Sequence, residues 1–267
     1  MTTVASGQGR LESVIADESG RLFFTDVLQN RVLRLDAPGA QPVVLATDVP
    51  SPGGLAWNDA GDLIVGYNGA GFFAPPGLRM AGLYAVDPDT GAKRPFASGF
   101  DQANGLARTS AGAYFTSNIV SGEIVRVSRA GTPSSWTTVP SSNGLVVDEQ
   151  SRHLFVATSL PSKVVRVRIA DPSKTTDWYD ASQEPEVLGF DGLARDGAGR
   201  LFVAANSAGQ VWRIDGQGQS CALARGLLTP SSVAFGGSST ATGFSSRNLY
   251  VVTHAGDVLE LAGVAGT

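Results

Sequence analysis

The sequence is poor in the residues that carry redox chemistry, zinc binding and nucleic-acid binding. It contains one cysteine, Cys221, together with two histidines and three lysines in 267 residues. A single cysteine excludes an internal disulfide bond, and Cys221 lies in an expected outer strand, where a small packing residue is favoured over a nucleophile. A net charge of -4 and a pI near 5.2 argue against binding to a phosphate backbone, so no nucleic-acid partner is expected.

Long apolar runs are also missing. No stretch approaches about 18 uninterrupted apolar residues, so neither a transmembrane span nor a membrane partner is expected. The N-terminus shows no basic region followed by an apolar stretch, which indicates no secretory signal and favours a cytoplasmic location. The 33 glycines and 14 prolines are dispersed, as in an all-β protein with frequent turns. No pattern indicates an oligomeric state.

A short pattern repeats along the chain, and its best example is residues 189–215. An apolar run, a Gly/Asp turn, a second run and a third run follow one another, each too short and too β-branched or aromatic for a helix. Six copies are found, with first strands opening at residues 12, 53, 104, 143, 191 and 231. A period in the forties with four short strands per unit is typical of a β-propeller. We predict an all-β, six-bladed β-propeller with four antiparallel strands per blade, forming a single domain over residues 1–267.

The fourth strand of each blade is the least regular part of the repeat. We expect these strands at residues 43–49, 93–100, 136–139, 186–190 and 222–227, and the sixth copy has none before the chain ends. Residues 2–7 resemble the other fourth strands, most clearly residues 96–99. The N-terminal strand is therefore expected to complete the last blade and close the ring, so that the two terminal edges cover each other.

Ring geometry brings equivalent positions of the repeat together at one mouth of the central channel. The start of each first strand and the end of each second strand share one face, because the two strands are antiparallel. The first positions are Glu12, Gly53, Asn104, Asn143, Asp191 and Ser231. The second positions are Asp26, Asn68, Asn118, Ser159, Asn206 and His254. One mouth is therefore predicted to be rich in oxygen ligands and to hold one imidazole.

Four of these side chains form a candidate metal site. Two carboxylates, Glu12 and Asp191, and two carboxamides, Asn104 and Asn143, would repel one another in a narrow channel unless a cation lay between them. An all-oxygen set favours a hard ion, so Ca²⁺ is the expected cofactor; Mg²⁺, Mn²⁺ and Zn²⁺ are alternatives, Zn²⁺ being disfavoured by the donor set. The competing interpretation is that Asn-Gly and Asp-Gly pairs are ordinary turns. Separate turn sequences such as residues 17–20 and 196–199, and the pair Glu12-Ser13, argue against it.

These residues also carry a family resemblance over nearly the whole chain. The chain resembles the gluconolactonase/regucalcin (senescence marker protein) family of six-bladed propellers, and more distantly diisopropyl fluorophosphatase and the paraoxonases. The matching segments are Glu12, Asn143-Gly144-Leu145 with residues 154–157, and Asp191-Gly192 with residues 201–204. The resemblance implies a divalent ion, usually Ca²⁺, held by Glu12, Asn143 and Asp191. The fluorophosphatase-like branch adds an asparagine, matched by Asn104, and a histidine near the ion, matched by His254.

The resemblance also implies hydrolysis of lactones or related esters, with a small-molecule substrate. Asp191 is the expected base or nucleophile, and His254 is an alternative base, since its unperturbed pKa lies near neutrality; a hydrogen-bonded histidine without a chemical role is the competing interpretation. Two departures argue against gluconolactone specificity: the family's Glu-Gly-Pro is Glu12-Ser13-Val14, and its lactone-binding arginine is replaced by Gln102. Gln102 and Asn118 are candidate substrate contacts.

The longest insertion at this mouth, residues 68–80, is a candidate lid. Phe72 and Phe73 would give it an apolar surface, and Arg79 is a candidate anion contact. The alternative is a loop that packs its own aromatics on a neighbouring blade. Three functions therefore remain open: a lactone or ester hydrolase with organophosphate turnover as a side activity, a non-catalytic propeller with a structural ion, and a biosynthetic enzyme with a non-hydrolytic step.

Overall fold

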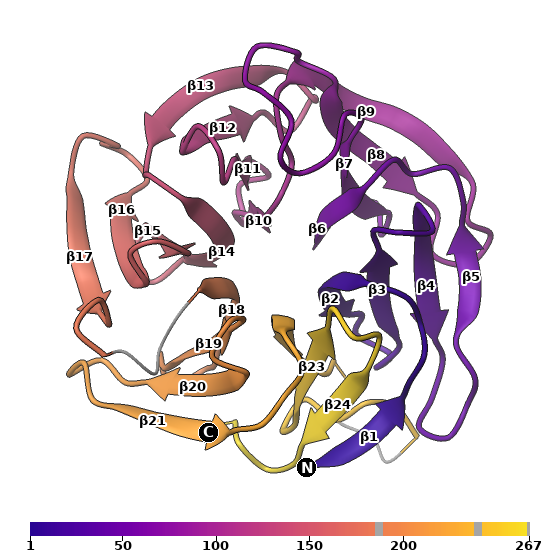
Figure 1. The fold of residues 1–267 in the computed structure, drawn as a ribbon. Coiled ribbons are helices and arrows are strands. Elements are labelled where there is room, and N and C mark those ends of the chain that lie inside the picture. The colour runs from indigo at the N-terminus through magenta and orange to yellow at the C-terminus, as the bar shows by residue number, and fades with distance from the viewer. Residues whose placement is uncertain (185–188, 238–241, 266–267) are drawn as a thin grey trace.

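Six four-stranded antiparallel sheets surround a central axis in the computed structural model, which describes residues 1–184, 189–237 and 242–265 (Figure 1). Every regular element in these ranges is a strand. The search of the described residues for an apolar helix of membrane-spanning length finds none. The predicted six-bladed β-propeller is confirmed.

Each blade runs outward from the axis in chain order. Blades 1 and 2 consist of β2 (Leu11–Ala16), β3 (Leu22–Asp26), β4 (Arg31–Leu35), β5 (Val43–Ala46), β6 (Pro52–Trp57), β7 (Leu63–Asn68), β8 (Ala81–Val86) and β9 (Lys93–Phe100). Blades 3 and 4 consist of β10 (Leu106–Arg108), β11 (Tyr114–Ser117), β12 (Glu123–Val127), β13 (Pro133–Thr138), β14 (Ser142–Asp148), β15 (His153–Thr158), β16 (Lys163–Arg168) and β17 (Thr175–Asp180). Blades 5 and 6 consist of β18 (Phe190–Arg195), β19 (Leu201–Ala205), β20 (Gln210–Ile214), β21 (Ser220–Ala224), β22 (Pro230–Phe235), β23 (Leu249–Thr253) and β24 (Val258–Leu261), with β1 (Thr2–Ala5) outermost.

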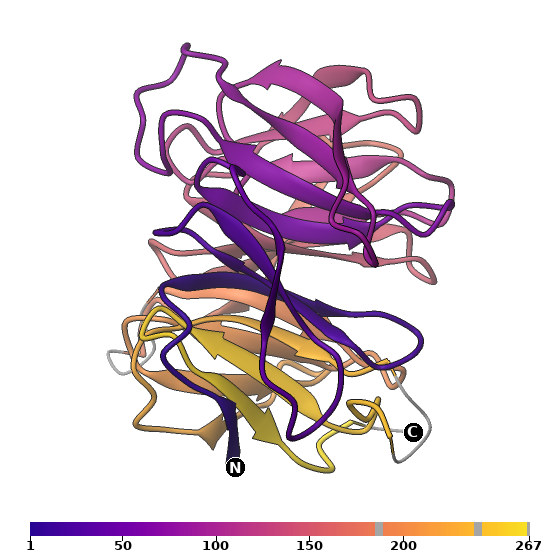
Figure 2. The ribbon, with the colours of Figure 1, turned by 90° about the vertical axis from the view of Figure 1, so that its right-hand side faces the viewer.

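The N-terminal strand closes the ring as predicted. β1 pairs antiparallel with β24, with Thr2 opposite Glu260 and Thr3 opposite Leu259, so the sixth sheet has the order β1-β24-β23-β22. Figures 1 and 2 both show the indigo N-terminal strand beside the yellow C-terminal strand. The N-terminal strand therefore covers the edge of β24 with backbone hydrogen bonds, and the chain that continues from β1 into β2 ties the last blade to the first.

One predicted strand is wrong. The fourth strand of blade 4 is β17 at Thr175–Asp180, whereas we expected it at residues 186–190. Of that expected segment, residues 185–188 are outside the described ranges, and Phe190 begins β18 of the next blade. The true strand was missed because its sequence, TTDWYD, is largely exposed and polar, as expected at an outer edge, whereas the apolar segment EVLGF gave the stronger strand signal.

A β-bulge recurs near the start of five of the six innermost strands. In blade 1, Leu11 pairs with Asp26 and Val14 with Phe24, so Glu12 and Ser13 lie opposite one residue of β3. The same irregularity occurs in blades 2, 4, 5 and 6. A bulge bends its strand and re-aims a side chain. Glu12, Asn143 and Asp191 each occupy the first bulged position, which explains why the repeat places polar side chains there.

The glycines that follow Asn143 and Asp191 are required by close packing. A Cβ on Gly144 would lie 2.3 Å from the carbonyl oxygen of Asp191, and one on Gly192 would lie 2.6 Å from Cα of Ser232. Neighbouring innermost strands therefore approach one another through these two positions. The Asn-Gly and Asp-Gly pairs allow this approach at the bulges, and the interpretation of them as ordinary turns is not needed.

Aromatic side chains fill the spaces between blades. Phe23 of β3 meets Trp57 of β6 edge-on with ring centroids 5.1 Å apart, and Phe202 of β19 meets Phe235 of β22 in the same way at 5.0 Å. Both second-strand phenylalanines are fully buried. Burial of such a side chain contributes roughly 1.5 to 3 kcal/mol. These contacts hold adjacent blades at a fixed distance, and hence hold the innermost strands around the axis.

Candidate metal centre

Three ionisable side chains from three blades meet at the axis. Ligand atoms of Glu12 on β2, Asp191 on β18 and His254 after β23 all lie within 4.8 Å of one another. Asn104 and Asn143 line the same space, and both are 5 % exposed. The structure thus brings together all five side chains predicted to form the metal site and its histidine. Their roles as ligands remain predictions.

A hydrogen-bond chain connects the two carboxylates. Asn206, at the end of blade 5's second strand, donates from Nδ2 to Asp191 Oδ2 over 3.1 Å and lies 3.4 Å from Nδ1 of His254. His254 Nε2 lies 2.9 Å from Glu12 Oε2. Because Asn206 presents an N–H to Nδ1, the consistent tautomer carries its proton on Nε2 and donates it to Glu12. His254 therefore orients Glu12, and neither ring nitrogen of this tautomer is left free to act as a base.

Asp191 lies in an environment that disfavours its charged form. Its side chain is buried, and burial followed by the neighbouring Glu12 carboxylate raises the pKa of Asp191 well above the ordinary value of 3.8. Hydrogen bonds from Asn206 and Asn143 and the charge of Arg10 act in the opposite direction but are smaller than the burial effect. A buried carboxylate beside a second carboxylate is relieved either by a proton or by a cation.

Hydrogen bonds hold both asparagines in place, through the side chain of Asn143 and through the backbone of Asn104. Asn143 donates from Nδ2 to Ser159 Oγ over 3.1 Å, and Ser159 in turn donates to the carbonyl oxygen of Phe190 over 3.0 Å. With its nitrogen engaged, Asn143 presents its amide oxygen as the available ligand atom. Asn104 donates its backbone N–H to Ser117, which fixes the start of blade 3 at the same level of the channel.

The site opens into a cavity of about 460 Å³, which we call the mouth cavity. Its apolar lining residues are Val27, Phe72, Phe73, Ile119 and Leu160. Beside the site residues, it is also lined by Arg10, Ser51, Ser159, Gly189 and Ser207. Phe72 and Phe73 come from the loop between β7 and β8, so the loop reaches the site as expected. Phe73 is 76 % exposed at the rim. The cavity therefore combines a polar floor with apolar walls, as is typical of small-molecule sites.

The other predicted substrate contacts lie outside the lining of this cavity. Gln102 is buried, donates from Nε2 to the Phe72 carbonyl oxygen, and accepts the Ile119 N–H at Oε1 over 2.5 Å. Asn118 accepts the backbone N–H groups of Val120 and Ser121. Arg79 is exposed on the loop. Gln102 thus ties the loop to blade 3, and Asn118 caps a turn.

One residue of the mouth cavity was missed by the repeat pattern. Arg10 lines the cavity, yet it precedes the first strand and so has no equivalent among the ring positions. Its Nε is buried without a hydrogen-bond partner. The sequence contains one signal that would have pointed to it: a lone arginine two residues before Glu12, in a chain segment that crosses from the last blade to the first.

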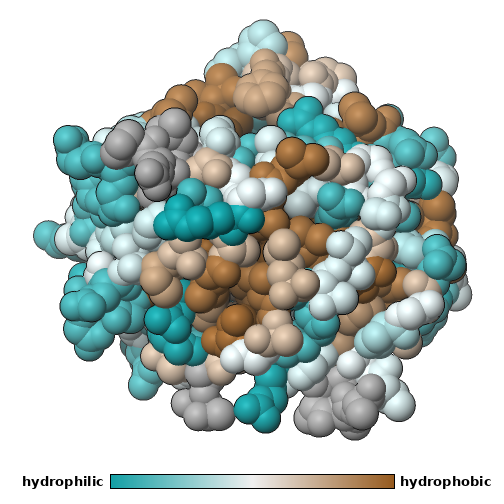
Figure 3. Space-filling view, turned by 60° about the horizontal axis from the view of Figure 1, so that its bottom comes forward, coloured by the Kyte–Doolittle hydropathy of each residue, from teal (hydrophilic) through white to brown (hydrophobic). Residues whose placement is uncertain are grey.

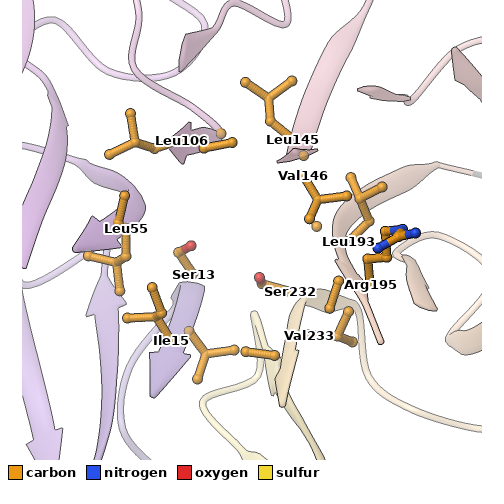
Figure 4. Close-up of a pocket in the computed structure, with 18 of the residues that line it drawn as sticks. Ser13, Ile15, Leu55, Leu106, Leu145, Val146, Leu193, Arg195, Ser232 and Val233 are labelled. Atoms are coloured by element: carbon orange, nitrogen blue, oxygen red, sulfur yellow. The ribbon is translucent and has the colours of Figure 1, made fainter. Parts of the chain in front are cut away.

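A second cavity lies on the other side of the same residues. This axial channel has a volume of about 490 Å³ and shares Glu12, Asn104, Asn143 and Asp191 with the mouth cavity. Figure 4 shows side chains from all six innermost strands around it: Ser13, Ile15, Leu55, Leu106, Leu145, Val146, Leu193, Arg195, Ser232 and Val233. On the face shown in Figure 3, apolar residues gather toward the middle and hydrophilic ones lie around them. The polar site is therefore a layer between two cavities.

The donor set fits a hard divalent cation. Two carboxylates and two amide side chains line the same space, and burial together with the neighbouring Glu12 carboxylate raises the pKa of Asp191, so a cation here would stabilise the charged form. Ca²⁺ accepts six to eight oxygens in flexible geometry, which suits ligands from four separate blades. His254 contributes nitrogen at the edge of the set, but its Nε2 faces Glu12. We therefore regard Glu12, Asn104, Asn143 and Asp191 as the residues that would hold the ion.

Comparison with known proteins gives one family. The model of the SMP-30/gluconolactonase/LRE-like region matches residues 11–255. No sequence among the curated proteins matches the chain.

Solved structures give the same fold at low identity. A calcium-binding regucalcin from Agrobacterium tumefaciens is 18 % identical, with a TM-score of 0.75, covering 97 % of this chain and 92 % of that one. A gluconolactonase from Xanthomonas campestris is 16 % identical, with a TM-score of 0.75 and coverages of 97 % and 88 %. Virginiamycin B lyase from Staphylococcus aureus is 13 % identical, with a TM-score of 0.65 and coverages of 94 % and 80 %.

Proposed function

Since the chain belongs to the SMP-30/gluconolactonase/LRE-like family, we propose that it is a divalent-metal-dependent hydrolase of lactones or related esters. The proposal depends on one observation: Glu12, Asp191 and His254 converge within 4.8 Å beside Asn104 and Asn143, at the floor of an open cavity. The fold alone does not decide the chemistry, because the same propeller is found in a gluconolactonase and in a lyase.

The expected cofactor is Ca²⁺, held by Glu12, Asn104, Asn143 and Asp191. When bound, a divalent cation at this place would supply Lewis acidity, which would polarise the substrate's carbonyl oxygen and stabilise the charge that develops during attack. The chain's own contribution is orientation. His254 fixes Glu12 and Asn206 fixes Asp191 through the hydrogen bonds given above, so the carboxylates are held in place before substrate arrives.

Asp191 is the residue proposed to act on the reacting atoms. Its carboxylate either takes a proton from water as that water attacks the carbonyl carbon, or attacks the carbonyl carbon itself. In the first case the bond from the carbonyl carbon to the ester or ring oxygen breaks, and Asp191 returns the proton to that leaving oxygen. In the second case the leaving oxygen takes a proton from water, and a further water hydrolyses the acyl–Asp191 anhydride to release the acid. Asn206 holds Oδ2 of Asp191 and keeps the side chain in one orientation. When a substrate fills the mouth cavity, it would displace water from the polar floor and so strengthen these interactions.

The cavity walls favour a small-molecule substrate more apolar than a sugar lactone. Phe72, Phe73 and Ile119 line the cavity, and the position of the family's lactone-binding arginine is taken by Gln102, which is bonded to the loop. Organophosphate turnover is the proposed side activity, since the same polarised centre suits a phosphoryl oxygen.

The proposal is tested with the purified protein after chelation and after titration with Ca²⁺. Binding is measured by calorimetry, and hydrolysis is followed on a panel of γ- and δ-lactones and aryl esters. We expect turnover only in the metal-loaded protein, with Asp191→Asn lowering kcat by about 10²- to 10⁴-fold and preserving the folded structure by circular dichroism. The matched control Asp215→Asn changes an exposed turn outside the site. Parent-like hydrolysis by Asp191→Asn would remove the proposed role of Asp191, and tight Ca²⁺ binding without any turnover would favour a structural ion.

A further inference from the structure

Arg10 is held in place by hydrogen bonds of its main chain, whereas its guanidinium makes no hydrogen bond to a described residue. Its N–H donates to Asp26 Oδ1 over 3.1 Å, and its carbonyl oxygen accepts the N–H of Val27 over 2.9 Å. Asp26 is fully buried and also accepts Nε of Arg31 over 3.0 Å. The backbone of Arg10 is therefore fixed against blade 1, independently of what its side chain does.

The residues just before Arg10 are equally constrained. Gly9 has a φ of +100°, and a Cβ on it would lie 2.3 Å from the Asp26 carboxylate. On the other side, Gln8 donates its N–H to the carbonyl oxygen of Gly256 over 3.0 Å. The segment 8–10 thus passes through a narrow gap between blades 6 and 1, and only glycine fits at position 9.

Arg10 is half-buried and lines the mouth cavity, and its guanidinium has no partner in the described ranges. No hydrogen bond or ion pair joins it to a described residue, and its Nε is buried. A buried donor left unpaired is costly, so an unpartnered cationic side chain in the wall of a cavity indicates a ligand that completes it. The positive charge of Arg10 acts to lower the pKa of Asp191, and both residues line the mouth cavity.

A guanidinium matches the planar geometry of a carboxylate and binds it through two parallel hydrogen bonds. The cavity is also lined by five apolar side chains, Phe72, Phe73 and Leu160 among them. We infer that Arg10 is the anion-recognition residue of the mouth cavity, and that the substrate is a lactone or ester with an apolar body and a carboxylate group. This inference rests on the proposed function, but Arg10's preference for an anion can be tested without turnover.

The test measures binding of benzoate and of its neutral isostere benzamide to the Ca²⁺-loaded protein. We expect the parent to prefer benzoate, and Arg10→Gln to weaken benzoate binding by about 10- to 100-fold, as for loss of a charge-assisted pair, while benzamide binding stays the same. Arg10→Lys is expected to recover part of the preference, because lysine offers a point charge and no fork. Folding is expected to survive, since the side chain makes no bond, and thermal unfolding checks this.

Two further variants separate the explanations. Arg126→Gln removes the same charge from an exposed position on β12 and is expected to change nothing. Arg79→Gln tests the loop arginine: loss of the preference there, with Arg10→Gln unaffected, would place the anion contact on the loop and overturn the inference. Benzoate binding that is insensitive to Arg10→Gln would show direct binding to the ion, and would overturn it too.

The outcome is independent of the hydrolase proposal. Arg10-dependent preference for benzoate in a protein that hydrolyses no lactone or ester would retain Arg10 as an anion site and refute only the proposed function. Hydrolysis of neutral lactones with no preference for carboxylate-bearing ones, together with an Arg10→Gln variant that binds benzoate normally, would retain the function and refute the role of Arg10.

Discussion

Nε2 of His254 lies 2.9 Å from Oε2 of Glu12, although 242 positions separate the two residues in the sequence. The contact joins the last blade to the first at the level of the site. It depends on ring closure by β1 and on the bulge that turns Glu12 toward the axis. The same two features that complete the fold therefore also complete the candidate metal centre.

The first prediction concerns His254 as a positioning residue. A group that orients a metal ligand typically contributes about 10- to 100-fold to metal affinity, so His254→Ala is expected to weaken Ca²⁺ binding by that amount. His254→Gln, whose amide N–H can still donate to Glu12, is expected to retain most of the affinity. Calorimetry measures both, with His153→Ala as the control. Parent-like Ca²⁺ binding by His254→Gln together with lost turnover and a changed pH profile would instead assign His254 a chemical role.

The second prediction concerns the effect of pH on metal binding. Burial and Glu12 raise the pKa of Asp191 above 3.8, so in the metal-free protein this group favours folding below that pH, and the contribution is lost as the pH rises through the raised pKa. A cation requires the ionised form. Ca²⁺ affinity is therefore expected to increase with pH between 3.8 and the raised pKa, with release of about one proton per ion, and then to level off.

Calorimetry in buffers of different protonation enthalpy measures this proton release. Asp191→Asn removes the titrating group, so any residual Ca²⁺ binding is expected to lose the pH dependence in this range. A parent protein whose Ca²⁺ affinity is constant from about pH 5 to pH 8, with no proton release, would show that the carboxylate is already ionised in the absence of metal.

Much of the architecture is predictable because the same pattern of strands and turns occurs six times in the sequence. Second and third strands such as those at Leu201 and Gln210 pack between neighbouring blades and are buried on both faces. The sequence therefore shows them as short, largely apolar runs. The outer strands are half-exposed, so their sequences need not be apolar and carry only a weak strand signal. The predicted position of β17 was wrong for that reason. Ring closure was predictable from the missing sixth outer strand.

The sequence predicted which residues line the site, but it did not predict the hydrogen bonds that connect them. Glu12, Asn104, Asn143 and Asp191 occupy one position of the repeat, and His254 occupies a second position that the antiparallel strands bring to the same mouth. The roles of Asn206 and Gln102 depend on side-chain rotamers and on the path of the loop, which no periodicity records. Arg10 lies in a single crossing between blades, outside the repeat, and only the packing of its backbone against Asp26 reveals where it lies.

The third prediction concerns the close approach of the innermost strands at Gly144. A methyl group there would lie 2.3 Å from the Asp191 carbonyl oxygen, so Gly144→Ala is expected to force blades 4 and 5 apart. Overpacking of this kind costs about 1 to 3 kcal/mol, and Ca²⁺ affinity is expected to fall as Asn143 and Asp191 separate. Urea denaturation and calorimetry measure the two effects. Gly216→Ala is the control, because nothing lies within 4 Å of its position.

The last prediction concerns Gln102, whose amide connects the loop of residues 68–80 to blade 3. Gln102→Leu preserves the volume but removes the hydrogen bonds to the Phe72 carbonyl oxygen and from the Ile119 N–H. Leaving those buried groups unpaired is expected to cost about 1 to 3 kcal/mol and to release Phe72 and Phe73 from the mouth cavity. Hydrogen exchange should therefore become faster at Ile119 and in the loop, and KM should rise more than kcat falls. The control Gln217→Leu alters an exposed turn. If KM rises while exchange in the loop stays at the parent's rate, Gln102 acts on the substrate directly and its contact with Phe72 is incidental.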